Sequence, residues 1–279
     1  MKSEYNVKFI DHIELSADEI KEIFKDVFMP GERVVIKLHF GEPGNKTAFT
    51  PEIVRPFVQV LNEMGFETVL FDCPVLYPSP RDNKGTYEKY IFDKGFDEIS
   101  PCEICDDYEP VKLHDGEVAE LAKIMTNAKN LLVLTHVKGH QMAGFGGSIK
   151  NIGIGATSPK TKALVHEVEK NNGGYGFSED RLGEVVAAAI KKMPKNKLFI
   201  NIIRDVTKGC DCLGHSTKII APDLGVVVSD NLVLVDQASL DIVNKSVTDA
   251  FTKATKINPQ THIDSTAKYS GLLKEYTLT

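Results

Sequence analysis

The sequence predicts a single α/β domain whose sheet is mostly parallel or mixed, with helices on both faces. Strand-like and helix-like segments alternate along all 279 residues. The stretch 33–72 has the order strand, capped helix, glycine, strand, which is typical of a parallel βαβ unit with a right-handed crossover. The chain has no internal repeat and no low-complexity tract. We therefore expect one domain, with its ligand site at the carboxyl edge of the sheet.

Composition narrows the class of protein. The chain is 42% hydrophobic and 26% charged, which is ordinary for a globular protein. Its net charge of −6 argues against nucleic-acid binding, which needs a basic face. No run is long enough to span a bilayer, and the first residues lack a signal-peptide core. Five cysteines are too few for a secreted disulfide scaffold. We expect a cytoplasmic protein without a membrane or nucleic-acid partner.

The individual elements follow from apolar periodicity and from capping signals. Ser16 and Glu19 form a capping box, and Thr50 before Pro51 is a good helix start. The expected strands are 6–10, 33–40, 67–72, 131–136, 197–203 and 225–228. The expected helices are 16–27, 51–64, 86–94, 118–127, 180–193 and 236–245. Between them, 74–80 is a proline-rich loop, and 170–178 has the composition of a flexible linker.

The most unusual stretch is a glycine-rich loop after the strand at 131–136. Six glycines, among them Gly146 and Gly147, fall between Gly139 and Gly155. This density indicates unusual backbone dihedrals or close approach to another group. Cationic and polar side chains interleaved with the glycines suggest a pocket for an anion: Lys138, His140, Lys150, Asn151 and Lys160. A tight structural turn is the alternative interpretation.

This loop matches neither common phosphate-binding motif. Residues 144–150 lack the closing Gly-Lys-Ser/Thr of a nucleotide P-loop. Ile149 stands where a dinucleotide fingerprint has its third glycine. A generic anion site is still compatible with the sequence, because a helix that begins at Ser148 would point free N–H groups toward the loop.

Cys210-Asp211-Cys212 is the strongest candidate for a metal site. Residues two apart in an extended segment point to the same side, so two thiolates here can bind one soft metal ion or one iron of a cluster. His215 is the nearest nitrogen ligand in the sequence. A disulfide between the two cysteines would close a strained ring. The alternative is a pair of small buried hydrophobic residues.

Cys102 and Cys105 form a second pair, at a spacing used in redox and metal sites. Together with Cys210 and Cys212 they could complete a four-thiolate site for zinc or an iron–sulfur cluster, although no positional rule joins the two pairs. They could equally belong to a loop. The run of four cysteines seen in bacterial ferredoxins is absent.

Three histidines lie at expected strand ends or in the glycine-rich loop: His39, His136 and His140. Strand ends of a parallel sheet gather at one edge, so we expect these side chains to converge. Glu42 could act beside them as a general base or a ligand. Asp236 and Gln237 are expected to open a helix, where the carboxylate is either a cap or a ligand. Three other histidines are expected to be core or surface residues without a role in the site: His12, His114 and His262.

Several of these segments resemble the DUF362 family of uncharacterised proteins, whose members are often labelled iron–sulfur proteins. The resemblance runs from about residue 33 to the C-terminus. It is carried by Ile36–Asn45, Thr135–Gly155, Cys210–Cys212 with His215-Ser216, Pro222–Gly225 and Val235–Ala238. The pair Cys102 and Cys105 is not part of the family pattern.

One departure from the family matters for function. Many members carry a ferredoxin-like insert with two cysteine runs after the counterpart of His166, where this chain has only Lys170–Phe177. The resemblance implies that the electron-carrying module has been lost or that a separate ferredoxin-type protein supplies it.

Together these observations predict a metal- or iron–sulfur-assisted oxidoreductase that acts on a small anionic substrate, with electrons from a ferredoxin-type partner. The alternatives are a non-redox small-molecule or phosphate-binding protein and a carrier of a metal or cluster. The expected metal ligands are Cys210, Cys212, His215, His140 and His39. The expected catalytic residues are Glu42, Lys138 and Lys150. The expected substrate-binding residues are Asn45, Gly146, Gly147, Asn151 and Lys160.

Overall fold

The computed structural model describes residues 6–168 and 173–279. Its centre is an eight-stranded sheet with the strand order β14-β1-β13-β10-β7-β2-β3-β4. The strands are β1 (Asn6–Ile10), β2 (Val34–Lys37), β3 (Thr68–Asp72), β4 (Cys102–Ile104), β7 (Asn130–His136), β10 (Asn196–Ile203), β13 (Gly225–Ser229) and β14 (Thr277–Leu278). The predicted α/β fold class is confirmed.

Five neighbouring strands, from β10 to β4, run parallel. Only β13 is antiparallel to both of its neighbours, β10 and β1. The predicted βαβ unit is confirmed, because β2 and β3 pair in parallel and α2 (Pro51–Glu63) connects them. The chain returns from β7 to β10 through α7 (Glu179–Lys192).

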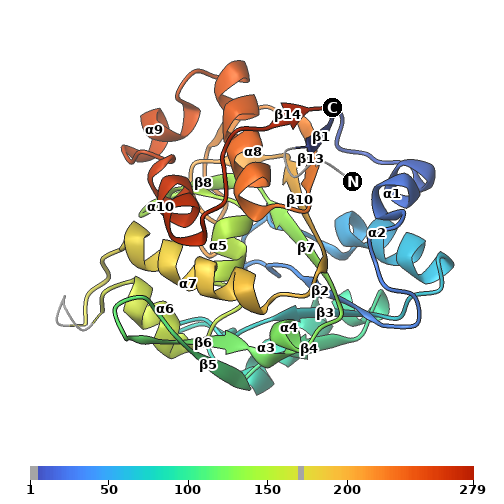
Figure 1. Ribbon diagram of the computed structural model, residues 1–279, viewed down its shortest axis with the longest axis horizontal. Coiled ribbons are helices and arrows are strands. Elements are labelled where there is room, and N and C mark those ends of the chain that lie inside the picture. Colours follow the sequence, from blue (N-terminus) through green and yellow to red (C-terminus); the bar gives the residue numbers. More distant parts are fainter. Residues whose placement is uncertain (1–5, 169–172) are drawn as a thin grey trace.

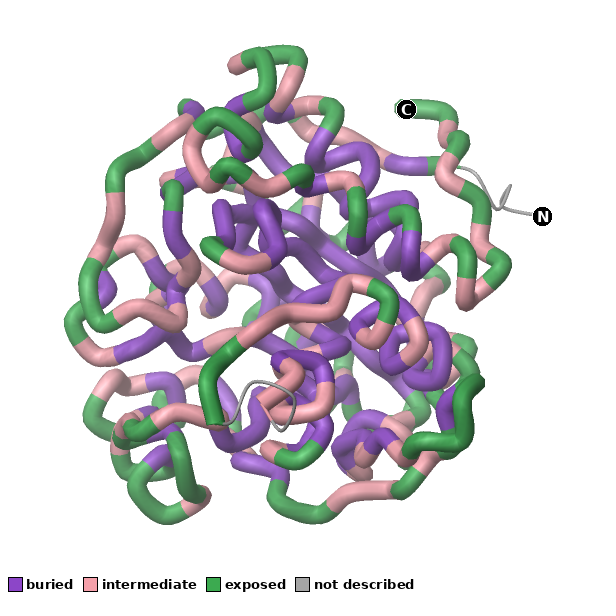
Figure 2. The backbone as a smooth tube through the Cα atoms, turned by 90° about the vertical axis from the view of Figure 1, so that its left-hand side faces the viewer, coloured by how far each residue is buried: buried purple, intermediate pink, exposed green. Residues whose placement is uncertain are grey.

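Helices cover both faces of the sheet (Figure 1). On one face lie α1 (Ala17–Phe24), α2 and α3 (Lys84–Asp93); on the other lie α5 (Ser148–Gly153), α7 and α8 (Leu232–Ser246). Successive residues of a strand point to opposite faces, so Val35 packs in one core and Ile36 in the other. Figure 2 shows buried residues concentrated in this interior and exposed ones in the outer turns.

Three two-stranded hairpins complete the strand pairing. They are β5 (Tyr108–Lys112) with β6 (Val118–Ala122), β8 (Lys138–His140) with β9 (Gly144–Gly146), and β11 (Val206–Thr207) with β12 (Ile219–Ala221). The remaining helices of the described chain are η1 (Phe96–Glu98), α4 (Lys123–Thr126), α6 (Pro159–Val165), α9 (Ala250–Thr255) and α10 (Thr261–Ser270). No helix in the described ranges is both long and apolar enough to cross a membrane.

Some predicted elements were wrong. The helix expected at 118–127 is instead strand β6 followed by one turn of α4, because its alternating Ala119 and Leu121 are buried when β6 pairs with β5. Helix α8 begins at Leu232, capped by Asn231, so Asp236 lies inside the helix and does not open it. Strand β2 ends three residues before the expected end. The predicted linker at 170–178 begins outside the described residues, and 174–178 contain no helix or strand.

Candidate metal centre and ligand cavity

A cavity of about 390 Å³ lies at the carboxyl edge of β2, β3 and β7. The chain leaves β2 toward β3 on one side and leaves β7 toward β10 on the other, so the strand order diverges between β2 and β7. Ligands of open α/β sheets bind at such a point. The cavity is lined by the segments that follow these strands, by α5 and α6, and by the loop that contains both cysteines of the Cys-Asp-Cys motif.

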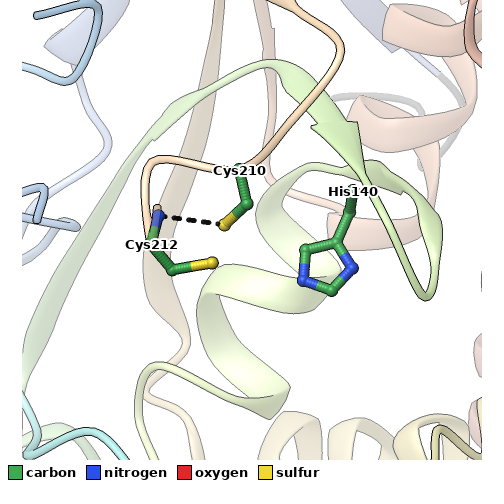
Figure 3. Close-up of side chains that lie close together, drawn as sticks. All are labelled: His140, Cys210 and Cys212. Atoms are coloured by element: carbon green, nitrogen blue, oxygen red, sulfur yellow. Dashed lines mark hydrogen bonds between the residues drawn. The ribbon is translucent and has the colours of Figure 1, made fainter. Parts of the chain in front are cut away.

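His140, Cys210 and Cys212 converge on this cavity. One ligand atom from each residue lies within 4.8 Å of the other two. Figure 3 shows the imidazole facing the two sulfur atoms. It is the only such group of three or more His, Cys, Asp and Glu residues in 6–168 and 173–279. Two thiolates and one imidazole form a donor set that soft divalent metals accept.

Gly139 allows the two segments of this group to meet. A Cβ atom at this position would lie 2.2 Å from the carbonyl oxygen of Lys208. Only glycine therefore lets strand β8, which ends in His140, pack directly on the segment that leads into Cys210. At this position of the loop, the close approach of the Lys208 carbonyl explains why a glycine is needed.

Asp211 anchors the cysteine loop from its other side. Its Oδ2 atom lies 2.9 Å from Nδ1 of His136 and 2.9 Å from Nζ of Lys138. Burial opposes ionisation, but these two groups hold the pKa of Asp211 below its ordinary value. The alternation predicted for Cys210, Asp211 and Cys212 thus has a structural role: the carboxylate fixes the loop while both sulfurs line the cavity.

The two thiols shift each other's pKa in opposite directions. A hydrogen bond from the Cys212 thiol lowers the pKa of Cys210 well below that of an ordinary cysteine, and His140 and Lys138 act in the same direction. The same contact raises the pKa of Cys212. The site therefore favours a thiolate at Cys210, and both sulfurs would have to be deprotonated to hold a metal ion.

The orientation of His140 is fixed by the turn that follows it. Its Nδ1 atom accepts hydrogen bonds from the N–H groups of Met142 and Ala143, at 3.2 and 3.1 Å. Nε2 lies 3.2 Å from Nζ of Lys150. A metal-bound histidine more often donates from its second nitrogen. Here the second nitrogen faces two N–H donors, so Nε2 is the ring atom that would face a metal ion held with the two sulfurs.

The cations that line the cavity fall into two groups. Lys138 pairs with Asp211, and Arg81 pairs with Glu42 at 3.1 Å; Lys37, which does not itself line the cavity, pairs with Asp72 at 2.9 Å. By contrast, neither Lys150 nor Lys162 forms an ion pair with a carboxylate of residues 6–168 and 173–279. The cavity therefore has more positive than negative side chains.

Five predicted site residues line this cavity directly: Lys138, Gly146, Gly147, Lys150 and Asn151. Glu42 does not line it but pairs with Arg81, which does. Glu42 accepts hydrogen bonds from Tyr77, Ser79 and Arg81. Asn151 accepts one from Lys37. His39 also lines the cavity, although it is outside the His140 group; burial lowers its pKa to about 3, so the ring is neutral.

The structure places three other predicted site residues elsewhere. His215 is exposed and is not part of the metal-ligand group. The side chain of Lys160 is 73% exposed and faces Glu120 at 3.7 Å. The side-chain oxygen of Asn45 accepts the N–H groups of Thr47 and Ala48, and so shapes its own turn.

The generic anion site predicted at Ser148 was wrong, although Ser148 does begin α5. Asp236 fills the position: its carboxylate accepts the N–H groups of Ser148 and Ile149, at 2.7 and 2.9 Å. A Cβ at Gly147 would lie 2.4 Å from this carboxylate, so glycine makes room for it. Burial raises the pKa of Asp236 to about 6. Asp236 therefore occupies the N–H groups of Ser148 and Ile149, on which the predicted anion site depended.

The four-thiolate hypothesis was also wrong. Cys102 packs against the core beneath α3, whereas Cys105 lies in the core on the opposite face of the sheet, beside Cys73. Neither belongs to the group that contains Cys210 and Cys212.

Four residues of the cavity were missed by sequence reasoning: Asp72, Arg81, Lys162 and His166. Asp72 carries a usable signal, because it ends a predicted strand at the expected edge of the sheet. Arg81 follows the proline-rich loop, and the other two lie on or just after α6. No local pattern indicates that these three side chains turn inward.

The fold and the site define an α/β protein with a candidate thiolate–imidazole metal centre at the carboxyl edge of its sheet. The chain belongs to the DUF362 family, described as a domain of unknown function, whose model matches residues 34–241. No curated protein matches the sequence.

Two solved structures share parts of this architecture. A structural-genomics protein from Thermotoga maritima superposes with a TM-score of 0.50 at 10% identity, over 89% of this chain and 61% of its own. The lactate racemase apoprotein from Thermoanaerobacterium thermosaccharolyticum gives a TM-score of 0.46 at 19% identity, over 72% of this chain and 51% of its own. The chain thus spans only about half to three fifths of each protein, and at these identities the likeness concerns the fold alone.

Proposed function

We propose that this protein is a metal-assisted enzyme that acts on a small anionic substrate in the cavity at the carboxyl edge. The observation that carries the proposal is the group formed by His140, Cys210 and Cys212, which opens into a cavity lined by cations. Three protein ligands beside open space are typical of catalytic metal sites, whereas structural zinc sites have four.

The donor set favours a single soft ion, such as zinc, nickel, copper or iron. An iron–sulfur cluster is normally held by four cysteines, and only two cysteines belong to the group within the described chain. When bound, such an ion would polarise a substrate oxygen or exchange an electron. A redox reaction with a ferredoxin-type donor is the version that the family resemblance favours.

The residues of this chain have separate roles in the proposal. Lys150, beside His140, holds an anionic group of the substrate next to the metal. Lys138 acts through Asp211 and keeps the cysteine loop in place. Glu42, which sequence reasoning made a proton carrier, holds Arg81 at the cavity wall, because three hydrogen bonds already engage its carboxylate.

Metal analysis of anaerobically purified protein, together with its absorption spectrum, tests the proposal. We expect about one equivalent of a soft metal, which is lost when Cys210 and Cys212 are both changed to Ser. Cys102→Ser is the matched control, because this thiol lies outside the cavity. Protein without metal, with the double variant unchanged in ligand binding and melting temperature, would contradict the proposal.

A non-redox ligand-binding protein is the second candidate. The buried Lys162 favours this second function. It forms no ion pair with a carboxylate of the described residues, so an anion can bind there without any metal. In that case carboxylated and phosphorylated compounds would raise the melting temperature of metal-free protein as much as that of metal-loaded protein. Lys150→Ala would then abolish the stabilisation, and Lys160→Ala, on an exposed side chain, would preserve it.

A further inference from the structure

We propose that the ligand of this cavity carries two anionic groups, and that Lys162 binds the one that is farther from the metal centre. The inference deepens the proposed function, on which it rests for the position of the first anionic group, beside Lys150. Lys162 belongs to no motif in the sequence, and the function proposed above does not require it.

Lys162 is a buried cation that forms no ion pair with a carboxylate of the described residues. It lies on α6, lines the cavity and is only 3% exposed. Its ammonium group donates to the carbonyl oxygen of Thr157, and no ion pair joins it to a carboxylate of the described residues. Burial lowers the pKa of Lys162 to about 8, so the ammonium form still predominates at neutral pH. A buried charge without a partner is costly unless a ligand compensates it.

The charges of the cavity indicate how many anionic groups are needed. Carboxylates of the protein already neutralise Lys37, Lys138 and Arg81. If a divalent metal binds, the two thiolates neutralise it. Two cations then remain without a counter-charge, Lys150 and Lys162. A ligand with two negative charges would balance both of them.

The two free lysines serve different ends of the cavity. The ammonium group of Lys150 lies 3.2 Å from Nε2 of His140, beside the metal-ligand group, whereas that of Lys162 donates to the carbonyl oxygen of Thr157. His166 feels both ammonium groups. One compact anion bound at Lys150 would therefore leave Lys162 uncompensated, and two anionic groups on a short spacer would reach both.

His166, which also lines the cavity, adds a neutral acceptor to it. Its Nδ1 atom lies 2.8 Å from the carbonyl oxygen of Lys162, to which it must donate. Burial lowers the pKa of His166 to about 4, so the ring carries no charge and its Nε2 is unprotonated. The ring packs edge-on against Phe177 at 5.4 Å, and Lys150 lies over the same phenyl ring at 4.8 Å. This wall supports a small organic spacer as well as its charged ends.

Isothermal titration of the full, metal-loaded chain with carboxylates tests the inference. Malonate, succinate and glutarate supply two charges at three spacings; butyrate supplies one, and inorganic phosphate tests a single compact anion. We expect at least one dicarboxylate to bind roughly tenfold tighter than butyrate or phosphate, the equivalent of about 1.4 kcal/mol. The preference should disappear in Lys162→Met, which keeps the length of the side chain but removes its charge.

Two control variants make the result interpretable. Lys160→Met removes a neighbouring charge that is exposed, and should retain the preference. Lys162→Arg keeps the charge and should restore it, which separates loss of a charge from loss of folding. The inference is overturned if the native chain prefers no dicarboxylate or binds none of them. It is also overturned if Lys162→Met retains the preference.

Metal content, measured on the same samples, separates this inference from the proposed function. Protein without metal that still prefers dicarboxylates through Lys162 would overturn the metal-assisted function and leave the second anion site standing. Protein with one metal equivalent and no preference would do the reverse.

Discussion

Two cysteine pairs with short spacings lie in different parts of this molecule, and their fates differ. Cys210 and Cys212 stand in a loop where alternate residues face one cavity and meet His140. Cys102 begins β4 and Cys105 directly follows its last residue, and the two side chains point into the cores on opposite faces of the sheet. Spacing alone therefore does not make a metal site. The backbone conformation decides whether two sulfurs share one side.

The pKa of each thiol also depends on the groups beside its sulfur. In the cavity, the Cys212 thiol, His140 and Lys138 favour a thiolate at Cys210. In the core, burial raises the pKa of Cys102 to about 12, whereas a hydrogen bond from the Cys73 thiol lowers that of Cys105 to about 6. Donors beside a sulfur, and not its position in a motif, prepare it to bind a metal.

The largest effect is expected from breaking the cavity pair. Cys210→Ser should weaken metal binding by more than the roughly 10- to 100-fold that loss of an outer-shell partner costs, because it removes a direct ligand. Competition with a chromophoric chelator measures the affinity. The comparison fails if Cys102→Ser, the control from the core pair, weakens binding by a similar factor.

A smaller effect should follow from moving the two halves of the centre apart. In Gly139→Ala, the added methyl group would meet the Lys208 carbonyl at 2.2 Å and push β8 away from the cysteine loop. We expect a loss of about 1–3 kcal/mol in the free energy of unfolding, together with weaker metal binding. Urea denaturation measures the first. Gly85→Ala in α3, where the nearest atom would be 3.8 Å away, should cost nothing; equal losses in both variants would contradict this explanation.

The hairpin that positions His140 also predicts an acid sensitivity. His262 stacks on Phe145 of β9, at 5.8 Å between ring centroids, and burial lowers its pKa to about 3. The unfolded chain takes up a proton below about pH 6.5 and the folded chain does not, so stability falls as the pH is lowered from 6.5 toward 3.

At pH 5 this difference amounts to about 2 kcal/mol. His262→Phe keeps the aromatic packing and should lose that share of the acid sensitivity, measured as the change in unfolding free energy between pH 7 and pH 5. His12→Gln, at an exposed site, should behave like the native chain. An unchanged pH slope in His262→Phe would count against a neutral buried ring.

The smallest effect concerns the two members of the core pair. A hydrogen bond from the Cys73 thiol lowers the pKa of Cys105 to about 6, whereas the pKa of Cys102 is raised to about 12. At pH 7 we expect iodoacetamide to alkylate Cys105 roughly tenfold faster, although Cys105 is the more buried of the two. Peptide mass spectrometry measures both rates. Faster reaction at Cys102 would mean that exposure outweighs thiolate formation here.

Features set by neighbouring residues could be predicted from the sequence. The capping box of Ser16 and Glu19 depends on contacts only a few residues apart, and the βαβ unit follows from its caps and the periods of its strands and helix. Cys210 and Cys212 do face one cavity, but they lie in a turn, in which the Leu213 N–H donates to the Cys210 carbonyl, and not in the extended segment that the sequence predicted. The convergence of strand-end side chains follows from the parallel sheet, whose carboxyl ends form one edge.

Features set by distant partners could not be predicted. The strand at 118–122 is a different case: it pairs with β5 across a short turn that contains Asp115-Gly116, a local hairpin signal that sequence reasoning missed. The free N–H groups of α5 belong to Asp236, which is 88 residues away from Ser148. Lys162 and His166 face the cavity only because α6 packs beside it. Such contacts depend on tertiary packing, for which the local sequence carries no signal.

X-ray absorption spectroscopy of the metal-loaded protein tests the central claim most directly, because it counts the ligands of the ion. The account predicts two sulfur neighbours and one imidazole nitrogen, at about 2.3 and 2.0–2.1 Å if the metal is zinc. The sulfur signal should vanish when Cys210 and Cys212 are both changed to Ser and persist when Cys102 and Cys105 are. A metal shell made only of nitrogen and oxygen, or one that depends on Cys102 and Cys105, would contradict it.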